Sequence, residues 1–150
     1  MYHEEERGME IREATLNDIK ELAVLMDQLG YPTTVEQMRI RLHAIEASPN
    51  HYTLVACYEM KVVGMIGFHT DILYNKDGIY ARVIAFVVGA NYRNKGIGKL
   101  LLNEVESFAK KIGAVGIGLN SGNRKERANA HQFYRKMGYK AESTGFSKPL

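Results

Sequence analysis

An apolar strand, an amphipathic helix and a second apolar strand, in that order, constrain the fold of this chain most. The run Ile79–Val88 is long enough for a central strand buried on both faces. Apolar residues then repeat at helical spacing from about Asn94 to Ile112, and Ala114–Leu119 is short enough for a buried strand. Because a strand that returns through a crossover helix lies parallel to its predecessor, the sequence predicts a right-handed parallel unit.

Two amphipathic helices are expected ahead of this unit, after a short strand at Met9–Ala14. The first helix has a capped start at Thr15–Asp18 and ends at Gly30. The second helix begins near Thr33, with Glu36 completing a capping box. Each helix carries an apolar stripe, which predicts that both pack against the sheet.

A hairpin and a C-terminal helix and strand complete the predicted fold. Tyr52–Glu59 and Lys61–Asp71 are expected to pair about a turn at Glu59-Met60. A helix over about 125–137 is followed by a last strand, Tyr139–Lys148. The resulting order, β-α-α-β-β-β-α-β-α-β with a central parallel pair, predicts a mixed α/β (α+β) sheet.

Length and composition are those of one ordinary globular domain. The 150 residues, 45% hydrophobic and 25% charged, suit a single domain at residues 9–150 after a polar leader of residues 1–8. The leader lacks the order of a signal peptide, and no apolar run approaches the roughly 18 residues of a membrane helix. The single cysteine, Cys57, lies in an apolar run and is expected to be a buried core residue. We therefore expect a cytoplasmic protein with no membrane partner.

The charges are distributed unevenly along the chain. Residues 1–92 carry 8 basic and 13 acidic side chains, whereas residues 93–140 carry 11 basic and 3 acidic ones. An acidic half beside a basic half suits a polyanionic cofactor bound next to a cationic acceptor, although solvated surface charge gives the same pattern. The basic segment has no nucleic-acid motif and no aromatic stacking array, so a nucleic-acid partner is not expected.

The loop Arg93–Lys99 is typical of an anion site. Its two glycines let the backbone approach a ligand closely, and the free N–H groups and positive dipole at the start of a helix attract phosphate. A Walker A loop would need glycine in place of Arg93 and serine or threonine in place of Leu100. A dinucleotide fingerprint would need glycine in place of Leu101. Neither of these phosphate motifs therefore fits.

Two segments carry a resemblance to a known family. Arg93–Gly98 is similar to the Gln/Arg-x-x-Gly-x-Gly/Ala signature of the GNAT superfamily of acyl-CoA N-acyltransferases, and Ala130–Tyr139 looks like that family's Ala-x-x-Phe-Tyr-x-x-x-Gly-Phe segment. The element order agrees as well, so the resemblance covers about residues 9–148. It implies a GNAT-like fold and an acetyltransferase that uses acetyl-CoA as its co-substrate.

The resemblance also assigns residues to the cofactor. Backbone N–H groups from Asn94 to Lys99 would cradle the pyrophosphate of CoA, and the end of the central strand would pair with the pantetheine arm. An N–H near Val88 would polarise the thioester carbonyl, and Asn120 would reach the pantetheine amides. The cofactor-binding residues implied are Phe86, Val87, Val88, Arg93, Asn94, Lys95, Gly96, Ile97, Gly98, Lys99, Asn120 and Tyr134.

Tyr134 is the one catalytic residue that the resemblance implies. Its hydroxyl would point at the thioester sulfur and protonate the departing thiolate. The alternative is a core aromatic residue, because Ala130, Phe133 and Met137 form an apolar stripe beside it. The sequence has no Ser-His-Asp or Cys-His set, so an amine is expected to attack the thioester directly. The five histidines show neither paired spacing nor cysteine partners, so no metal is expected.

Two departures from the family pattern leave roles open. Arg127 stands where many members carry asparagine, seven positions before the tyrosine. Many members also carry a glutamate base on the central strand, whereas Arg82 is the only charge in Ile79–Val88. The candidates that remain for the general base are His69, Asp71, Tyr80 and His131.

The acceptor is expected to be a small-molecule or peptide amine, held by the helices at 15–47 and by the loop Tyr74–Ile79. The missing glutamate keeps an alternative open, a non-catalytic acyl-CoA-binding sensor. A homodimer is a further expectation, because the last strand, Tyr139–Lys148, would leave an edge for a partner to cover.

Overall fold

The computed structural model describes residues 4–5, 8–121 and 128–150. The sheet has six strands in the order of the sequence, β1-β2-β3-β4-β5-β6. The strands are β1 Glu4–Glu5, β2 Met9–Glu13, β3 His51–Tyr58, β4 Lys61–Ile72, β5 Ile79–Val88 and β6 Ala114–Leu119. The helices are α1 Ile19–Leu29, α2 Val35–Ala47, α3 Ile97–Lys111 and α4 Ala128–Lys136. This mixed α/β architecture confirms the predicted fold class.

One parallel pair interrupts an otherwise antiparallel sheet. β5 and β6 run parallel, with α3 as the crossover between them, and every other neighbouring pair is antiparallel. The predicted central unit is therefore confirmed. The predicted hairpin turn is confirmed too, because Glu59 and Met60 both have positive φ, 50° and 70°, as a two-residue turn between twisted strands requires.

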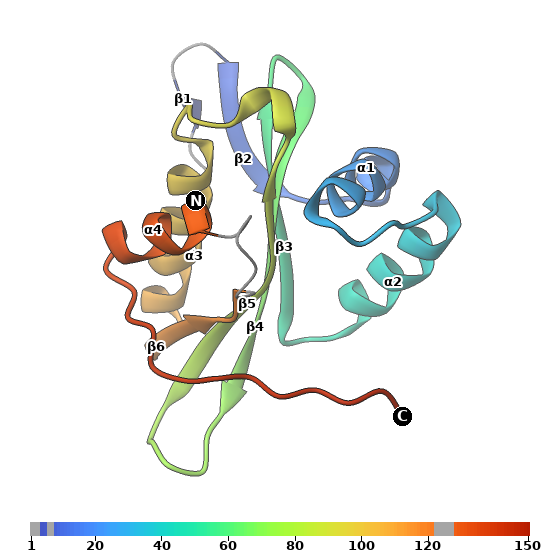
Figure 1. Ribbon diagram of the computed structural model, residues 1–150. Coiled ribbons are helices and arrows are strands. Elements are labelled where there is room, and N and C mark those ends of the chain that lie inside the picture. The colour runs from blue at the N-terminus through green and yellow to red at the C-terminus, as the bar shows by residue number, and fades with distance from the viewer. Residues whose placement is uncertain (1–3, 6–7, 122–127) are drawn as a thin grey trace.

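Helices cover both faces of the sheet and divide the core in two. α1 and α2 lie on one side and α3 and α4 on the other (Figure 1). The core under α3 is built from Ile11, Leu54, Ala56, Val63, Ile66, Phe68, Val83, Ile97, Leu101, Leu102 and Val105. The core under α1 and α2 is built from Ile19, Leu22, Ala23, Leu25, Met38, Leu42, Val55, Cys57, Val62, Met65 and Val87. Cys57 is thus a buried core residue, as predicted.

The helix starts differ slightly from their predicted positions. A 3-10 turn over Leu16–Asp18 precedes α1, and its capping box joins Thr15 and Asp18. The capping box of α2 joins Thr34 and Gln37 instead of the predicted Thr33 and Glu36, with both reciprocal bonds at 3.0 Å. The periodicity locates a helix, but neighbouring Thr-Thr and Glu-Gln pairs offer two equivalent frames for the cap.

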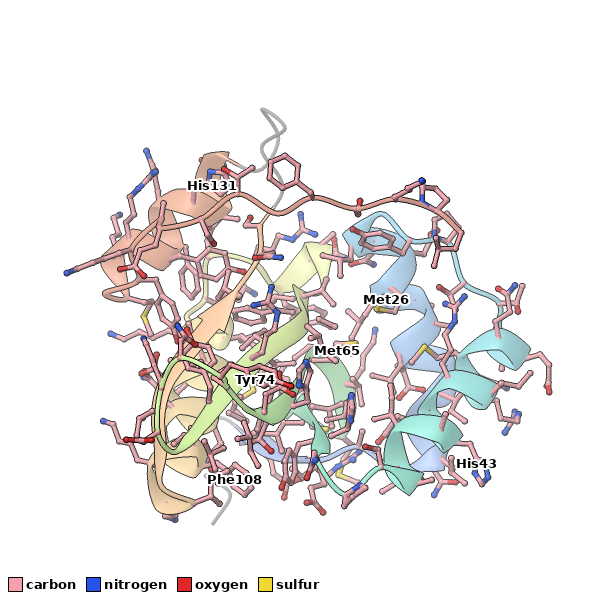
Figure 2. All side chains as sticks on the ribbon, turned by 90° about the horizontal axis from the view of Figure 1, so that it is seen from below. Met26, His43, Met65, Tyr74, Phe108 and His131 are labelled. Atoms are coloured by element: carbon pink, nitrogen blue, oxygen red, sulfur yellow. The ribbon has the colours of Figure 1, made fainter. Side chains whose placement is uncertain are left out.

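The C-terminal segment contradicts the prediction of a last strand at Tyr139–Lys148. The structure shows irregular backbone there, and the side chains after Tyr139 are exposed, with Phe146 95% accessible. Residues 140–145 are mostly small or charged, so pairing them on the sheet would bury little apolar surface. The segment instead crosses from α4 towards the side of α1 and α2 (Figures 1 and 2). In the described part of the chain β6 is therefore the edge strand, and the edge from which a homodimer was expected is not formed.

A buried carboxylate ties β2 to the start of α1. Asp18 is 3% exposed and accepts two bonds from the guanidinium of Arg12, at 2.8 and 2.9 Å. It also accepts the backbone N–H of Thr15 at 2.8 Å. The bonds from Arg12, with that of Thr15, hold the pKa of Asp18 below its ordinary value although burial opposes them.

Asp18→Asn should therefore lower the free energy of unfolding by about 2 kcal/mol at neutral pH, because charged hydrogen bonds are lost. Since the folded-state pKa of Asp18 is depressed, its contribution is present above about pH 4 and is lost as the pH falls through the folded value. Urea unfolding at neutral and acidic pH should show the gap between variant and wild type closing in acid. Glu36→Gln, which breaks the exposed pair of Glu36 with Arg39, is the control and should cost under about 0.5 kcal/mol.

Candidate active site

The parallel pair β5–β6 separates part-way along its length. The ladder runs from Ile79 opposite Ala114 to Val83 opposite Leu119, and it stops there. β5 continues to Val88, so the edge of its last five residues that would face β6 has no strand partner in the described part of the chain. Unpaired backbone groups of this kind need a hydrogen-bond partner, and an extended ligand can supply one.

A β-bulge lies at the point of separation. On the β4 side, Gly67 is opposite Ala85 and Phe68 is opposite Val83, so Ile84 is an extra residue on β5. Bulges bend a strand and redirect side chains, and they recur next to active sites. Ile84 is 50% exposed. The prediction that β5 is buried on both faces is therefore wrong at its centre, because register cannot be read from an apolar run.

A cavity of about 260 Å³ opens where the two strands part. It is lined by the end of α1, by the bulged part of β5, by the end of β6 and by α4. The lining residues are Leu29, Gly30, Tyr31, Val83, Ile84, Ala85, Phe86, Leu119, Asn120 and Tyr134. Three predicted site residues, Phe86, Asn120 and Tyr134, thus meet in one cavity. Tyr31 was not singled out from the sequence, because nothing there shows that the end of α1 meets β5.

The glycine-containing loop connects β5 to α3 and leaves N–H groups unpaired. Asn94 and Gly96 adopt left-handed backbone conformations, with φ of 63° and 81°. α3 therefore begins at Ile97 and not near Asn94 as predicted, and its first intrahelical bond joins the N–H of Leu100 to the carbonyl of Gly96 at 3.1 Å. The preceding N–H groups have no intrahelical acceptor and, with the positive end of the helix dipole, are suited to bind an anion, which makes this helix start the candidate anion site.

The side chains of this loop divide into one buried residue and several exposed ones. Ile97 is 3% exposed and packs into the core, so only its backbone can meet a ligand. Lys95 and Lys99 are exposed and add positive charge beside the helix start. Arg93 turns back, and its Nε donates to the carbonyl of Val88 at 3.2 Å, which fixes the end of β5.

Two backbone contacts hold the end of β5 in place. The N–H of Gly89 donates to the carbonyl of Val63 at 2.7 Å, and the N–H of Ala90 donates to Oε1 of Gln28 on α1 at 2.8 Å. The second bond joins segments 62 residues apart in sequence. The end of α1, which lines the cavity, is thereby tied to the loop that leads to the anion site.

Tyr134 lies among aromatic rings at the wall of the cavity. Its ring centroid is 6.3 Å from that of Phe86, 5.5 Å from Phe133 and 6.2 Å from Tyr139. Tyr139 donates its hydroxyl to Oε2 of Glu106 at 2.7 Å, and burial together with this bond raises the pKa of Tyr139. Tyr134 is thus packed from several sides and still borders the cavity. These contacts are compatible with both interpretations of this residue, the general acid and the core aromatic.

The candidate base residues lie in different places. His69 and Asp71, on β4, form an ion pair with Nδ1 and Oδ2 3.2 Å apart. His131 lies on α4, on the other side of the sheet from α1 and α2 (Figure 2). Arg127 falls outside the described residues. The loop between β4 and β5 does not line the cavity, and Tyr74 there is fully exposed.

Tyr80 holds the two parallel strands together at the end where they are paired. Its ring covers two glycines of β6: an added Cβ would lie 2.7 Å from the ring at Gly116 and 2.8 Å from the hydroxyl at Gly118. Tyr80 therefore has a packing role that the sequence did not reveal. The described residues include no group of three or more potential metal ligands, and none of their helices is long and apolar enough to span a membrane.

Comparisons with known proteins agree with this geometry. Residues 16–139 match the model of the acetyltransferase (GNAT) family. An uncharacterised N-acetyltransferase of Bacillus subtilis is 33% identical over 128 residues, 84% of this chain and 87% of that protein. The aminoalkylphosphonate N-acetyltransferase of Salmonella typhimurium is 29% identical over 142 residues, 94% of this chain and 91% of that protein.

A solved structure gives the same result. The crystal structure of a GNAT-family acetyltransferase of Staphylococcus aureus matches with a TM-score of 0.81 and 33% identity, over 95% of this chain and 98% of that one. The chain therefore belongs to the GNAT acetyltransferase family and is an N-acetyltransferase.

Gly116→Ala should lower the free energy of unfolding by about 1–3 kcal/mol, because the new methyl group overlaps the ring of Tyr80 at 2.7 Å. Gly67→Ala, also within the sheet, is the matched control, because a Cβ there would make ordinary contacts at 3.7 and 3.9 Å. Urea unfolding of both variants measures the difference. Equal stability of the two variants would show that Tyr80 moves aside without cost.

Proposed function

We propose that the chain binds acetyl-CoA along the free edge of β5 and transfers the acetyl group directly to a primary amine. The observation that carries this proposal is the cavity at the separation of β5 and β6, which the end of α1 lines, on the strand that leads to the candidate anion site. A cofactor that combines a pyrophosphate with an extended amide-containing arm is complementary to both features.

The cofactor would be held mainly by backbone groups. The pyrophosphate would accept bonds from the N–H groups between Asn94 and Lys99, with Lys95 and Lys99 supplying charge. The pantetheine arm would add as a short strand to Phe86, Val87 and Val88, and the side-chain amide of Asn120 would face it from β6. Because Val87 is 6% exposed and points into the core, only its backbone can contribute.

The chemistry asked of the chain is modest. Bound acetyl-CoA supplies an activated acyl carbonyl for a neutral amine to attack. An N–H near Val88 would donate to the carbonyl oxygen as negative charge develops there, and one such donor contributes about 3 kcal/mol. Tyr134 would deliver a proton to the departing sulfur. The lining of the cavity includes no side chain suited to covalent acyl transfer, which favours direct attack.

Two classes of acceptor are favoured by specific observations. The acidic surplus before Arg93 favours a cationic amine such as a polyamine. An amine that carries an anionic group is favoured by Arg82, which is half-buried on β5 next to the cavity and has no ion-pair partner within the described residues. The relative that is 29% identical is named for an aminoalkylphosphonate, an acceptor of this second class.

An acyl-CoA-binding sensor remains the alternative function, since the described residues that line the cavity include no imidazole or carboxylate to act as base. We further propose that the protein works in the cytoplasm, where acetyl-CoA is the acyl donor and the buried thiol of Cys57 stays reduced. Whether it forms a homodimer is a question for sedimentation experiments.

Lys99→Glu should weaken CoA binding about ten-fold or more, because it places a negative charge beside the site proposed for the pyrophosphate. Isothermal titration calorimetry with CoA measures the dissociation constant, and added salt should weaken wild-type binding more than binding by the variant. Lys110→Glu makes the same charge change at the other end of α3 and should alter the dissociation constant less than about two-fold. Equal losses in the two variants would assign the effect to net charge and count against the proposed site.

Tyr134→Phe should reduce turnover by about ten-fold or more, which corresponds to about 1.4 kcal/mol of transition-state stabilisation. The assay is thiol release from acetyl-CoA over a panel of polyamine, aminoalkylphosphonate, amino-sugar and peptide acceptors. Phe133→Leu, a change in the same aromatic cluster that removes no hydroxyl, controls for packing. Equal rates in Tyr134→Phe and wild type would leave Tyr134 as a packing residue. Saturable CoA binding without release on any acceptor would favour the sensor.

A further inference from the structure

A histidine and a carboxylate lie side by side on β4, on the face of the sheet that α1 and α2 cover. Residues alternate between the two faces of a strand, so His69 and Asp71 share a face with Met65, which packs into the core under α1 and α2. Nδ1 of His69 lies 3.2 Å from Oδ2 of Asp71. The side chain of His69 is 19% exposed, so water reaches the ring.

The ring of His69 is held from two directions. Asp71 places a carboxylate oxygen beside Nδ1, so Nε2 is the ring nitrogen away from the carboxylate. On the β3 side, the ring of His51 lies 5.1 Å away at an interplanar angle of 33°, and Nδ1 of His51 is 2.7 Å from the hydroxyl of Ser48. The ring of His69 is therefore flanked by a carboxylate on its own strand and by a second imidazole on β3.

The sheet register places His69 next to the cavity. His69 is the cross-strand partner of Arg82 on β5, and Val83, Ile84 and Ala85, which follow Arg82, line the cavity. On the same face the end of α1 supplies Leu29, Gly30 and Tyr31 to the lining. An amine that enters between α1 and the bulge therefore passes on the side of the sheet that carries His69.

The residues that line the cavity do not themselves identify the general base that accepts the proton of the amine. Among the residues that the structure describes, its lining includes two phenols and one amide but no imidazole and no carboxylate. A primary amine is protonated in neutral solution and must lose a proton before its nitrogen can attack. His69 lies on the neighbouring strand opposite Arg82, the residue that precedes the lining on β5, and it is in contact with water and next to a carboxylate, so it meets that need.

We infer that His69 is the proton acceptor for the incoming amine, directly or through one water, and that Asp71 is its positioning residue. This inference rests on the proposed function. Nε2 of His69 takes one proton from the ammonium group, and the freed nitrogen pair forms the C–N bond. The C–S bond breaks with its electron pair on sulfur. The second proton lost by nitrogen balances the proton that the sulfur gains, and the proton on His69 passes to solvent.

The groups that face His69 define its pH response. They are His51 from β3, Asp71 from β4 and Arg82 from β5, and Tyr80 is the cross-strand partner of Asp71. Arg82 carries a positive charge on this row, and the ring of His51 lies 5.1 Å from that of His69. Substitutions at His51 and Arg82 are therefore avoided in the test.

The test is the pH dependence of kcat/KM for His69→Gln, measured with an acceptor that the wild type uses. The variant should lose about 10²-fold near neutral pH and recover as the pH approaches the pKa of the acceptor amine, where solvent has already removed the proton. A less basic amine should lose less. Asp71→Asn should lower kcat with little change in KM, and Asp71→Glu should restore part of the rate. His43→Gln, on the outer side of α2 (Figure 2), is the matched control and should leave the profile unchanged.

The possible results separate the inference from the function beneath it. A His69→Gln profile that coincides with wild type, or that falls by the same factor at every pH, overturns the inference and leaves the transferase. Recovery at high pH, together with wild-type affinity for CoA by calorimetry, supports it. Absence of turnover by the wild type on every acceptor overturns the proposed function, and the inference with it.

Discussion

The site depends on the interruption of one hydrogen-bond ladder. β5 and β6 are paired as far as Val83 and Leu119, and beyond that point β5 continues without a strand neighbour on that side among the residues that the structure describes. Backbone N–H and C=O groups are costly to leave unpaired, so an open edge inside a domain persists only where water or a ligand reaches it. The cavity, the anion site at α3 and the position of Tyr134 all follow from this opening, because each is built from segments that the separation exposes.

Local contacts have opposite effects at the two ends of the β5–β6 pair: they keep the strands together at one end and apart at the other. At the closed end, the ring of Tyr80 lies over Gly116 and Gly118, and only glycine leaves room for it. At the open end, the extra residue Ile84 bends β5, while the bond from Ala90 to Gln28 fastens the strand end to α1. A small number of residues therefore holds the two strands together at the closed end and keeps them apart at the open end. Because so few contacts set the separation of the strands, the two cores on either side of the sheet need no unusual packing.

The sequence was sufficient for the features that depend on local order. Apolar runs located β5 and β6, helical spacing located the crossover helix, and the two glycines located the loop that leads into that helix. Two predicted element positions were wrong. The expected strand at Tyr139–Lys148 does not form, because it has too little apolar surface to pair. α3 starts at Ile97 and not near Asn94, because Asn94 and Gly96 take left-handed conformations. Phe86, Asn120 and Tyr134 could be predicted as neighbours from the family resemblance. The bulge and the contact between His69 and Asp71 depend on register, which no single strand reveals.

The bulge also has a consequence for how such a site can change over time. The side chain of Ile84 is half exposed and contributes little to the core, so many residue types fit there. A change in the number of residues in β5 has a different effect from a substitution. If the extra residue Ile84 were deleted, Val83 and Ala85 would become consecutive and pair with Phe68 and Gly67 in regular register, so the bulge would be lost while Val87 stayed in the core under α1 and α2. Substitution at residue 84 thus changes the chemistry of the cavity wall, whereas deletion at the same place removes the bulge that bends β5 there.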